Sequence, residues 1–184
     1  MESNREERTD KDYVHVLLGL SRRSHTGEKE RCIRKVDKGF GDEIEIFEAQ
    51  LKAIGGYWRI HKTVNARDVH KAMKHLMCNL IQHPEKASYI DSEWRTSLLQ
   101  SSCIYGDKYF MLDLDCNDKE FLSEVFSRME ESKAVVIEEH KSPKGIHIIT
   151  MPFDTREVCK IPNVSLLRDG YYFIKEVGEA KEER

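Results

Sequence analysis

The sequence predicts an α+β domain in which helices pack against an antiparallel or mixed β-sheet. Two observations indicate this class. Short runs rich in β-branched residues alternate with segments of helical periodicity, and the order from residue 57 is strand, helix, short helix, strand, helix and then several strands. That order fits a split β-α-β arrangement with added hairpins. The 184 residues are the length of one domain, and a hydrophobic content of 39% is enough to form a core.

The sequence divides into one domain with two polar ends. We expect residues 1–11 to be a disordered tail and residues 179–184 to be a charged tail. Residues 12–178 are expected to form a single domain, with an N-terminal hairpin and helix at 12–56 and a core at 57–178. In the N-terminal part, residues 13–20 and 32–36 are typical of paired strands, and the apolar spacing at 44–54 is helical.

The core at 57–178 contains two predicted long helices and several short strands. Asn65 is a good N-cap for a helix at 66–81, and Asn117 or Asp118 precedes a helix that continues to residue 129. A shorter helix is expected at 92–99. Asp169 and Gly170 are a strong two-residue turn signal, which predicts a terminal hairpin. The expected strands are 57–64, 108–114, 134–138, 146–151, 164–167 and 171–177, with a tight turn at 141–145.

Two carboxylates end the apolar run at 109–115. Successive side chains of a strand point to opposite faces, so Asp113 and Asp115 are expected to share a face at the end of this strand. Carboxylates that close repel each other unless a cation lies between them, and oxygen ligands of this kind suit Mg²⁺ or Mn²⁺. The alternative is that one Asp ends the strand and the other caps the following helix.

A second motif follows at residues 142–147, Ser-Pro-Lys-Gly-Ile-His. The turn supplies the hydroxyl of Ser142, the ammonium group of Lys144 and a glycine that permits close approach of a ligand. Alternation along the next strand places His147 on the face opposite Ile146 and Ile148. Lys144, His147 and the turn amides therefore make a plausible phosphate-binding site. The alternative for His147 is an ordinary half-exposed strand residue.

A third acidic residue, Asp169, lies in the predicted terminal turn. By itself it is an ordinary turn residue. If the terminal hairpin lies beside the carboxylate strand, Asp169 brings a third carboxylate to the same metals. Three acidic groups and a phosphate-binding histidine are suited to two-metal phosphoryl transfer, in which one ion activates a 3′ hydroxyl and the other holds the triphosphate.

In the order of these motifs, residues 109–174 resemble the archaeo-eukaryotic primase superfamily, the primase–polymerases. The resemblance implies an RRM-like core in which Asp113, Asp115 and Asp169 bind divalent metals and are catalytic, while Ser142, Lys144 and His147 contact the incoming nucleotide. It implies a minimal catalytic core of the sort that phages and plasmids encode. The turn departs from the family pattern at Pro143, where glycine is frequent.

A polar cluster that includes His61 beside basic side chains precedes the core helix. We expect Arg59, Lys62 and Arg67 to contact template or primer phosphates, because a strand-to-helix junction offers N–H groups to anions. The alternative is that Asn65 caps the helix and Arg67 forms a surface ion pair with Asp68.

The expected function is a metal-dependent nucleotidyltransferase that adds nucleotides from NTP or dNTP to a 3′ hydroxyl. The expected partners are nucleoside triphosphates, a nucleic acid template or primer, and replication proteins. The alternatives are a metal-dependent nuclease or terminal-transferase-like enzyme, an inactive module of the same fold that binds single-stranded nucleic acid, and a protein-interaction domain. Five scattered cysteines without a Cys-x-x-Cys pair fit a cytoplasmic location, and no apolar run is long enough to span a membrane.

Overall fold

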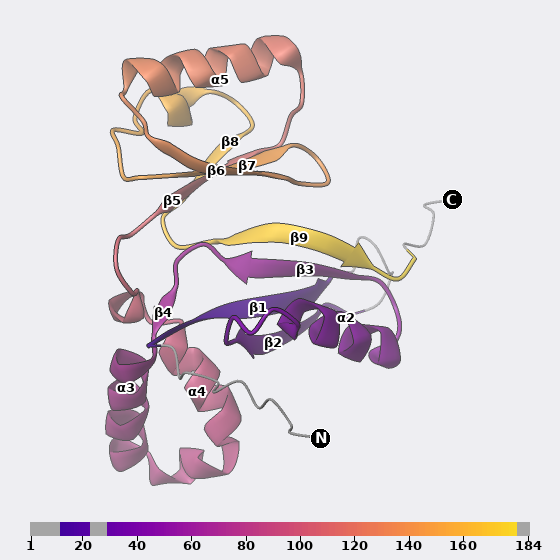
Figure 1. Ribbon diagram of the computed structural model, residues 1–184, viewed down its shortest axis with the longest axis vertical. Coiled ribbons are helices and arrows are strands. Elements are labelled where there is room, and N and C mark those ends of the chain that lie inside the picture. Colours follow the sequence, from indigo (N-terminus) through magenta and orange to yellow (C-terminus); the bar gives the residue numbers. More distant parts are fainter. Residues whose placement is uncertain (1–11, 23–28, 180–184) are drawn as a thin grey trace, which may run out of the picture.

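The computed structural model describes residues 12–22 and 29–179, and these residues form two antiparallel sheets with helices packed on them (Figure 1). The expected N-terminal tail and residues 180–184 of the expected C-terminal tail lie outside the described residues. The α+β class is therefore confirmed, with two sheets in place of the single sheet that was expected.

The first sheet has the strand order β2-β1-β3-β9, with the short strand β4 paired to the start of β1. Helix α2 covers one face of this sheet, where Phe47 and Leu51 pack against Leu17, Trp58 and Ile60. The elements are β1 (Tyr13–Ser21), β2 (Arg31–Asp37), α2 (Glu43–Ile54), β3 (Trp58–Thr63), β4 (Arg67–Asp68) and β9 (Tyr171–Val177).

The second sheet has the order β6-β7-β5-β8, and helix α5 covers its outer face (Figure 1). Leu112 and Leu114 of β5 pack with Ile148 of β7 against Val125 and Met129 of the helix. The elements are β5 (Phe110–Leu114), α5 (Lys119–Glu131), β6 (Val136–Lys141), β7 (Ile146–Thr150) and β8 (Val164–Leu167).

Two further helices, α3 (Val69–Gln82) and α4 (Ile90–Leu98), lie at the end of the molecule opposite α5 (Figure 1). They pack on the start of β1, where Val14 and Val16 contact the cluster that contains Ala72 and Leu98. Short 3-10 helices at Pro84–Tyr89, Ser101–Cys103 and Val158–Lys160 complete the connections.

The predicted hairpin of β1 and β2 is confirmed by antiparallel pairing from His15–Asp37 to Ser21–Arg31. The first sheet also pairs β1 with β3 and β3 with β9. Strands from both sides of residue 56 thus share one sheet, so the expected division into 12–56 and 57–178 does not separate two sheets.

The predicted terminal hairpin is wrong, although both of its strands exist. Strand β8 pairs with β5 in the second sheet, while β9 pairs with β3 in the first. The physical reason is the side chains that each strand buries: Val164 and Leu166 pack on the α5 core, and Ile174 and Val177 on the α2 core. Asp169 and Gly170 therefore lie where the chain passes from one sheet to the other.

The predicted N-cap is also wrong. Helix α3 begins at Val69, and Oδ1 of Asp68 accepts the N–H of Lys71 over 2.8 Å. Asn65 is instead buried, and its side chain bonds both the N–H and the C=O of Tyr109, at 2.7 and 3.1 Å. A tertiary contact 44 residues away thus holds the residue that the local pattern favoured as a cap.

Candidate functional site

A cavity of about 180 Å³ lies between the two sheets. Strands β3 and β9 of the first sheet form one wall, and β5, β7 and the turn between β6 and β7 form the other. Six of the nine residues singled out from the sequence line it. The lining residues are Arg22, Arg59, His61, Asp113, Asp115, Ser142, Pro143, Lys144, His147 and Phe173.

The two carboxylates share a face at the end of β5, as the alternation predicts. Leu112 and Leu114 are fully buried under α5, so Asp113 between them points to the other face, toward the first sheet. The side chain of Asp113 is 30% exposed, and Asp115 is exposed. The backbone N–H of Asp115 donates to the carbonyl of Asn163 over 3.0 Å, which holds the strand end in place.

His147 is buried and lies directly opposite Asp113 in the pairing of β5 with β7. The backbone N–H of Phe173, on β9 of the other sheet, donates to Nδ1 of His147 over 3.1 Å. An imidazole nitrogen that accepts a hydrogen bond carries no proton, so the neutral ring has its proton on Nε2. That atom is 3.2 Å from Oδ1 of Asp113. His147 thus joins the carboxylate strand to the first sheet.

The turn between β6 and β7 packs closely against the end of β5. The N–H of Gly145 donates to Oγ of Ser142 over 3.0 Å, and the N–H of Ser142 donates to the carbonyl of Gly145 over 2.9 Å. A Cβ atom at Gly145 would lie 1.8 Å from the carbonyl oxygen of Leu114. Glycine is therefore required for the approach that brings Lys144, which is exposed, to the same cavity as the carboxylates.

The first sheet contributes Arg59, His61 and Phe173 to the opposite wall. The guanidinium group of Arg59 forms an ion pair with Glu176 at 3.2 Å. The ring of His61 meets Phe173 edge-on, with centroids 5.8 Å apart, and its Nδ1 is buried without a hydrogen-bond partner among the described residues. Burial is the main cause that lowers the pKa of His61 to about 4, and the positive charge of the nearby Arg22 acts in the same direction. The ring is therefore neutral at pH 7.

Sequence reasoning included His61 in the polar cluster before the core helix but did not select it as a site residue, and it did not single out Arg22 at all. For His61 a signal existed: it lies two residues after Arg59 on the same strand, so period two places both on one face. For Arg22, which follows β1, the sequence contains no comparable signal.

Asp169 does not join the other two carboxylates, which corrects the expectation of a three-carboxylate site. Its oxygens accept hydrogen bonds from NH2 and NH1 of Arg67 at 2.6 and 3.0 Å, and Oδ1 also accepts from Asn65 at 3.2 Å. Asn65 also bonds Tyr109, so Asp169 is held beside the residue just before β5 begins. Asp113 lies four residues further along the strand, which is about 13 Å at the rise of a strand. Asp169 is therefore not beside Asp113. Among the described residues, no group of three or more His, Cys, Asp or Glu is placed to hold a metal ion.

Of the three predicted nucleic-acid contacts, only Arg59 lines the cavity. Lys62 opposes Leu17 on the face that α2 covers, and its ammonium group is 2.7 Å from Asp37. Arg67 is 1% exposed and binds Asp169, so it is not on the surface where it could contact a nucleic acid strand. The alternative ion pair between Arg67 and Asp68 is not formed either, since Asp68 pairs with Lys71.

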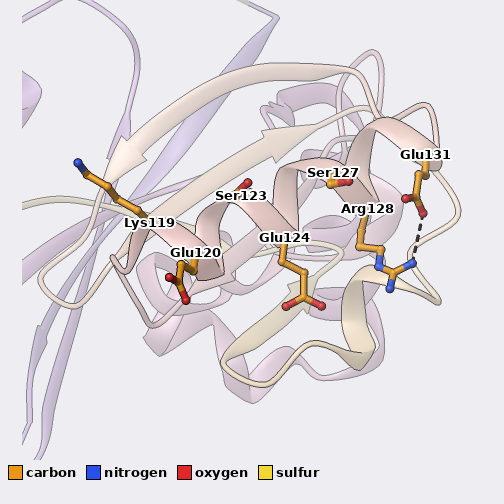
Figure 2. A pocket seen from close by; sticks show the side chains of 7 residues that line it. All are labelled: Lys119, Glu120, Ser123, Glu124, Ser127, Arg128 and Glu131. Atoms are coloured by element: carbon orange, nitrogen blue, oxygen red, sulfur yellow. Dashed lines mark hydrogen bonds and ion pairs between the residues drawn. The ribbon is translucent and has the colours of Figure 1, made fainter.

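A wider depression of about 650 Å³ runs along the solvent face of α5 (Figure 2). All seven of its lining residues come from this one helix, so it is open surface with no second wall. Its ion pair between Arg128 and Glu131, at 3.3 Å, joins neighbouring turns of the helix. None of the residues singled out from the sequence lies here, and the cavity between the sheets remains the candidate site.

The chain matches no protein-family model, and neither the curated proteins nor the solved structures contain a significant match to it. Among the residues that the structure describes, no helix has the length and apolar character needed to cross a membrane.

Proposed function

We propose that the cavity between the sheets binds a nucleoside triphosphate with Mg²⁺ or Mn²⁺, and that the protein is a nucleotidyltransferase of the primase–polymerase type. The observation that supports this most directly is the gathering of two separate motifs in one cavity. The carboxylates of β5 and the Ser-Pro-Lys-Gly-Ile-His turn are about 30 residues apart in sequence, yet Asp113 and His147 lie in one ladder and Lys144 lines the same wall.

The cationic side chains of the cavity suit the phosphates. Arg22, Arg59 and Lys144 line it, and guanidinium and ammonium groups form charge-assisted hydrogen bonds with phosphate oxygens. Arg59 gives up part of its ion pair with Glu176 when it does so, since that pair is solvent-accessible and weak. His61 is neutral and adds no charge to the cavity wall, where its ring packs edge-on against Phe173.

Asp113 and Asp115 fit the metal ion. Mg²⁺ in nucleotide sites is bound by one or two carboxylates together with the phosphates of the substrate, so a pair without Asp169 is a sufficient contribution from the protein. Both carboxylates are accessible from the cavity. The ion supplies neutralisation of the phosphate charge and activation of the attacking hydroxyl. His147 positions Asp113 through its Nε2–H, and Phe173 in turn fixes the ring.

A groove of about 680 Å³ adjoins the cavity and shares Arg59, Ser142, Pro143 and Phe173 with it. Lys141 adds a further cation along this groove, and Lys175 also lines it while its ammonium group pairs with Glu48 of α2. Aromatic and cationic side chains in a groove are the combination that binds single-stranded nucleic acid. We assign this groove to the strand that presents the 3′ hydroxyl.

Incorporation of a labelled nucleotide at the 3′ end of an oligonucleotide tests the proposal. In the presence of Mn²⁺ we expect products one or more nucleotides longer, and none from Asp113→Asn. Lys62→Ala is the matched control, because Lys62 lies on the opposite face of the strand that carries Arg59. It removes the partner of the buried Asp37 and so lowers stability, but below its unfolding transition it should leave incorporation unchanged.

The same assay separates the alternatives. Shortened oligonucleotides would identify a nuclease. Oligonucleotides of unchanged length, bound tightly by the wild type and equally tightly by Asp113→Asn, would identify an inactive binding module. Either result contradicts nucleotidyl transfer.

A further inference from the structure

Helix α3 carries an exposed apolar row that nothing in the described structure covers. Met73, Met77 and Ile81 are 45%, 58% and 77% exposed. They are spaced four residues apart, so they lie one above another along the same side of the helix. Other residues of the helix make its contact with the first sheet: Ala72 and Val69 pack in the cluster with Val14 and Val16. The exposed row is therefore not needed to hold the helix in place.

The ionisable side chains of α3 are all basic. The helix contains His70, Lys71, Lys74 and His75, and it contains no Asp or Glu. Lys74 lies three residues before Met77, so it borders the apolar row directly. The side chains of Lys74 and His75 are exposed and form no hydrogen bond or ion pair with another side chain that the structure describes.

We propose that α3 is the docking surface for an acidic amphipathic helix of another protein. A helix of that kind places its apolar residues on Met73, Met77 and Ile81 and its carboxylates beside Lys74. When one helix docks on another, the contacting side chains recur at intervals of three and four residues, and the four-residue spacing of the row fits this pattern. Methionine is flexible and polarisable, so a Met-rich surface adapts to apolar side chains of different shape.

Other occupants fit less well. A second copy of the protein, docked through the same row, brings the Lys74 residues of two α3 helices together, which like charge opposes. Residues 1–11, 23–28 and 180–184 contain only Met1 and Ala180 as apolar residues, so these segments have no apolar row to offer. A nucleic acid strand would use the lysines and leave the apolar row in water.

The docking surface is separate from the cavity between the sheets. No residue of α3 lines that cavity or the adjoining groove, and the helix lies at the other end of the molecule from α5 (Figure 1). The proposal therefore stands or falls independently of nucleotidyl transfer, and a bound partner leaves the candidate site open.

Fluorescence anisotropy with a labelled synthetic peptide tests it. The probe is a peptide of about 15 residues, long enough to form a helix, with leucines three and four apart and glutamates elsewhere. We expect saturable binding to the wild type. Met77→Glu and Lys74→Glu should each weaken the affinity at least about tenfold, the effect of losing 1.4 kcal/mol. A peptide with lysines in place of the glutamates should not bind.

Matched variants show whether the loss is local. Ile46→Glu makes the same apolar-to-acidic change at an exposed position of α2, and Lys119→Glu makes the same charge reversal on α5; both should bind the peptide as the wild type does. The proposal is overturned if the acidic peptide does not bind, or if the α3 variants bind it normally. Displacement of the peptide by single-stranded DNA, or self-association that Met77→Glu abolishes, would assign α3 to nucleic acid or to a second copy instead.

Discussion

Asp113 and His147 face each other across the β5–β7 ladder, with Nε2 of the histidine 3.2 Å from Oδ1 of the aspartate. The same imidazole accepts the backbone N–H of Phe173, which belongs to the other sheet. One ring therefore connects both walls of the cavity and orients the carboxylate that would hold a metal ion. The proposed chemistry depends on this connection between the two sheets.

Asp169 is expected to act in stability and not in nucleotide binding. Arg67, 2% exposed in its side chain, has its charge compensated by Asp169. Removing one partner of a buried ion pair leaves an unpaired charge and costs about 3 kcal/mol of the free energy of unfolding. Urea denaturation of Asp169→Ala should show this loss, while triphosphate binding, measured below the unfolding transition, stays as in the wild type.

Asp154→Ala is the control for that prediction, because Asp154 forms a bidentate ion pair with Arg156 that is exposed to solvent. Its denaturation midpoint should not move. Loss of triphosphate binding in a folded Asp169→Ala would instead restore Asp169 to the metal site.

Gly145→Ala is expected to damage both the fold and the site. The added methyl group meets the carbonyl oxygen of Leu114, so the turn must move away from the carboxylates. Such overpacking costs about 1–3 kcal/mol. We expect a lower denaturation midpoint together with weaker triphosphate binding in calorimetry. Gly106 has a φ of 66° and is not among the residues that line the cavity, so Gly106→Ala should lower stability and leave binding unchanged.

His61 makes stability depend on pH. Its pKa of about 4 in the folded protein is below its ordinary 6.5, so the unfolded chain binds more protons between these values. The free energy of unfolding therefore falls as the pH drops from 6.5 to 4, with a contribution on the order of 2–3 kcal/mol. His61→Phe keeps a ring beside Phe173 but does not titrate, so urea denaturation should show it gaining stability relative to the wild type at low pH.

Parallel pH profiles of the wild type and His61→Phe would contradict that assignment. Asp37, Glu48 and His15 also have lowered pKa values, but they titrate in both proteins and cancel in the difference.

The groove beside the cavity predicts a change in salt dependence. If Lys141 contacts one phosphate of a single strand, Lys141→Ala should weaken the salt dependence. The negative slope of log affinity against log salt should become smaller in magnitude by about 0.7. Oligonucleotide binding at several salt concentrations measures this slope. Lys119→Ala, which removes a lysine from the solvent face of α5, should leave it unchanged. An unchanged slope in Lys141→Ala would place the strand elsewhere.

Local periodicity was sufficient for the parts of the site that lie on single strands. Alternation along 109–115 placed Asp113 and Asp115 together, and alternation along 146–149 separated His147 from Ile146 and Ile148, as the core clusters show. The glycine at 145 was expected to permit close approach of a ligand, which stays a prediction; the structure shows a different need for it, the contact with the backbone of Leu114. These features depend only on the geometry of one strand or turn.

Long-range pairing was not predictable from the same signals. Asp169-Gly170 has the composition of a hairpin turn, but composition does not reveal that β8 and β9 find partners in different sheets. Asn65 and Asp68 are both good N-caps, and the contact of Asn65 with Tyr109 decided between them. The ion pair of Arg67 with Asp169 spans 102 residues, and nothing local indicates it.

The most direct test of the central claim is calorimetric titration of a nucleoside triphosphate with Mn²⁺ into the wild type, Asp113→Asn and Lys62→Ala. The account predicts metal-dependent binding to the wild type and to Lys62→Ala, and its loss in Asp113→Asn with the fold intact by circular dichroism. Absence of binding to the wild type, or equal binding to folded Asp113→Asn, would contradict the assignment of the cavity between the sheets as a metal-dependent nucleotide site.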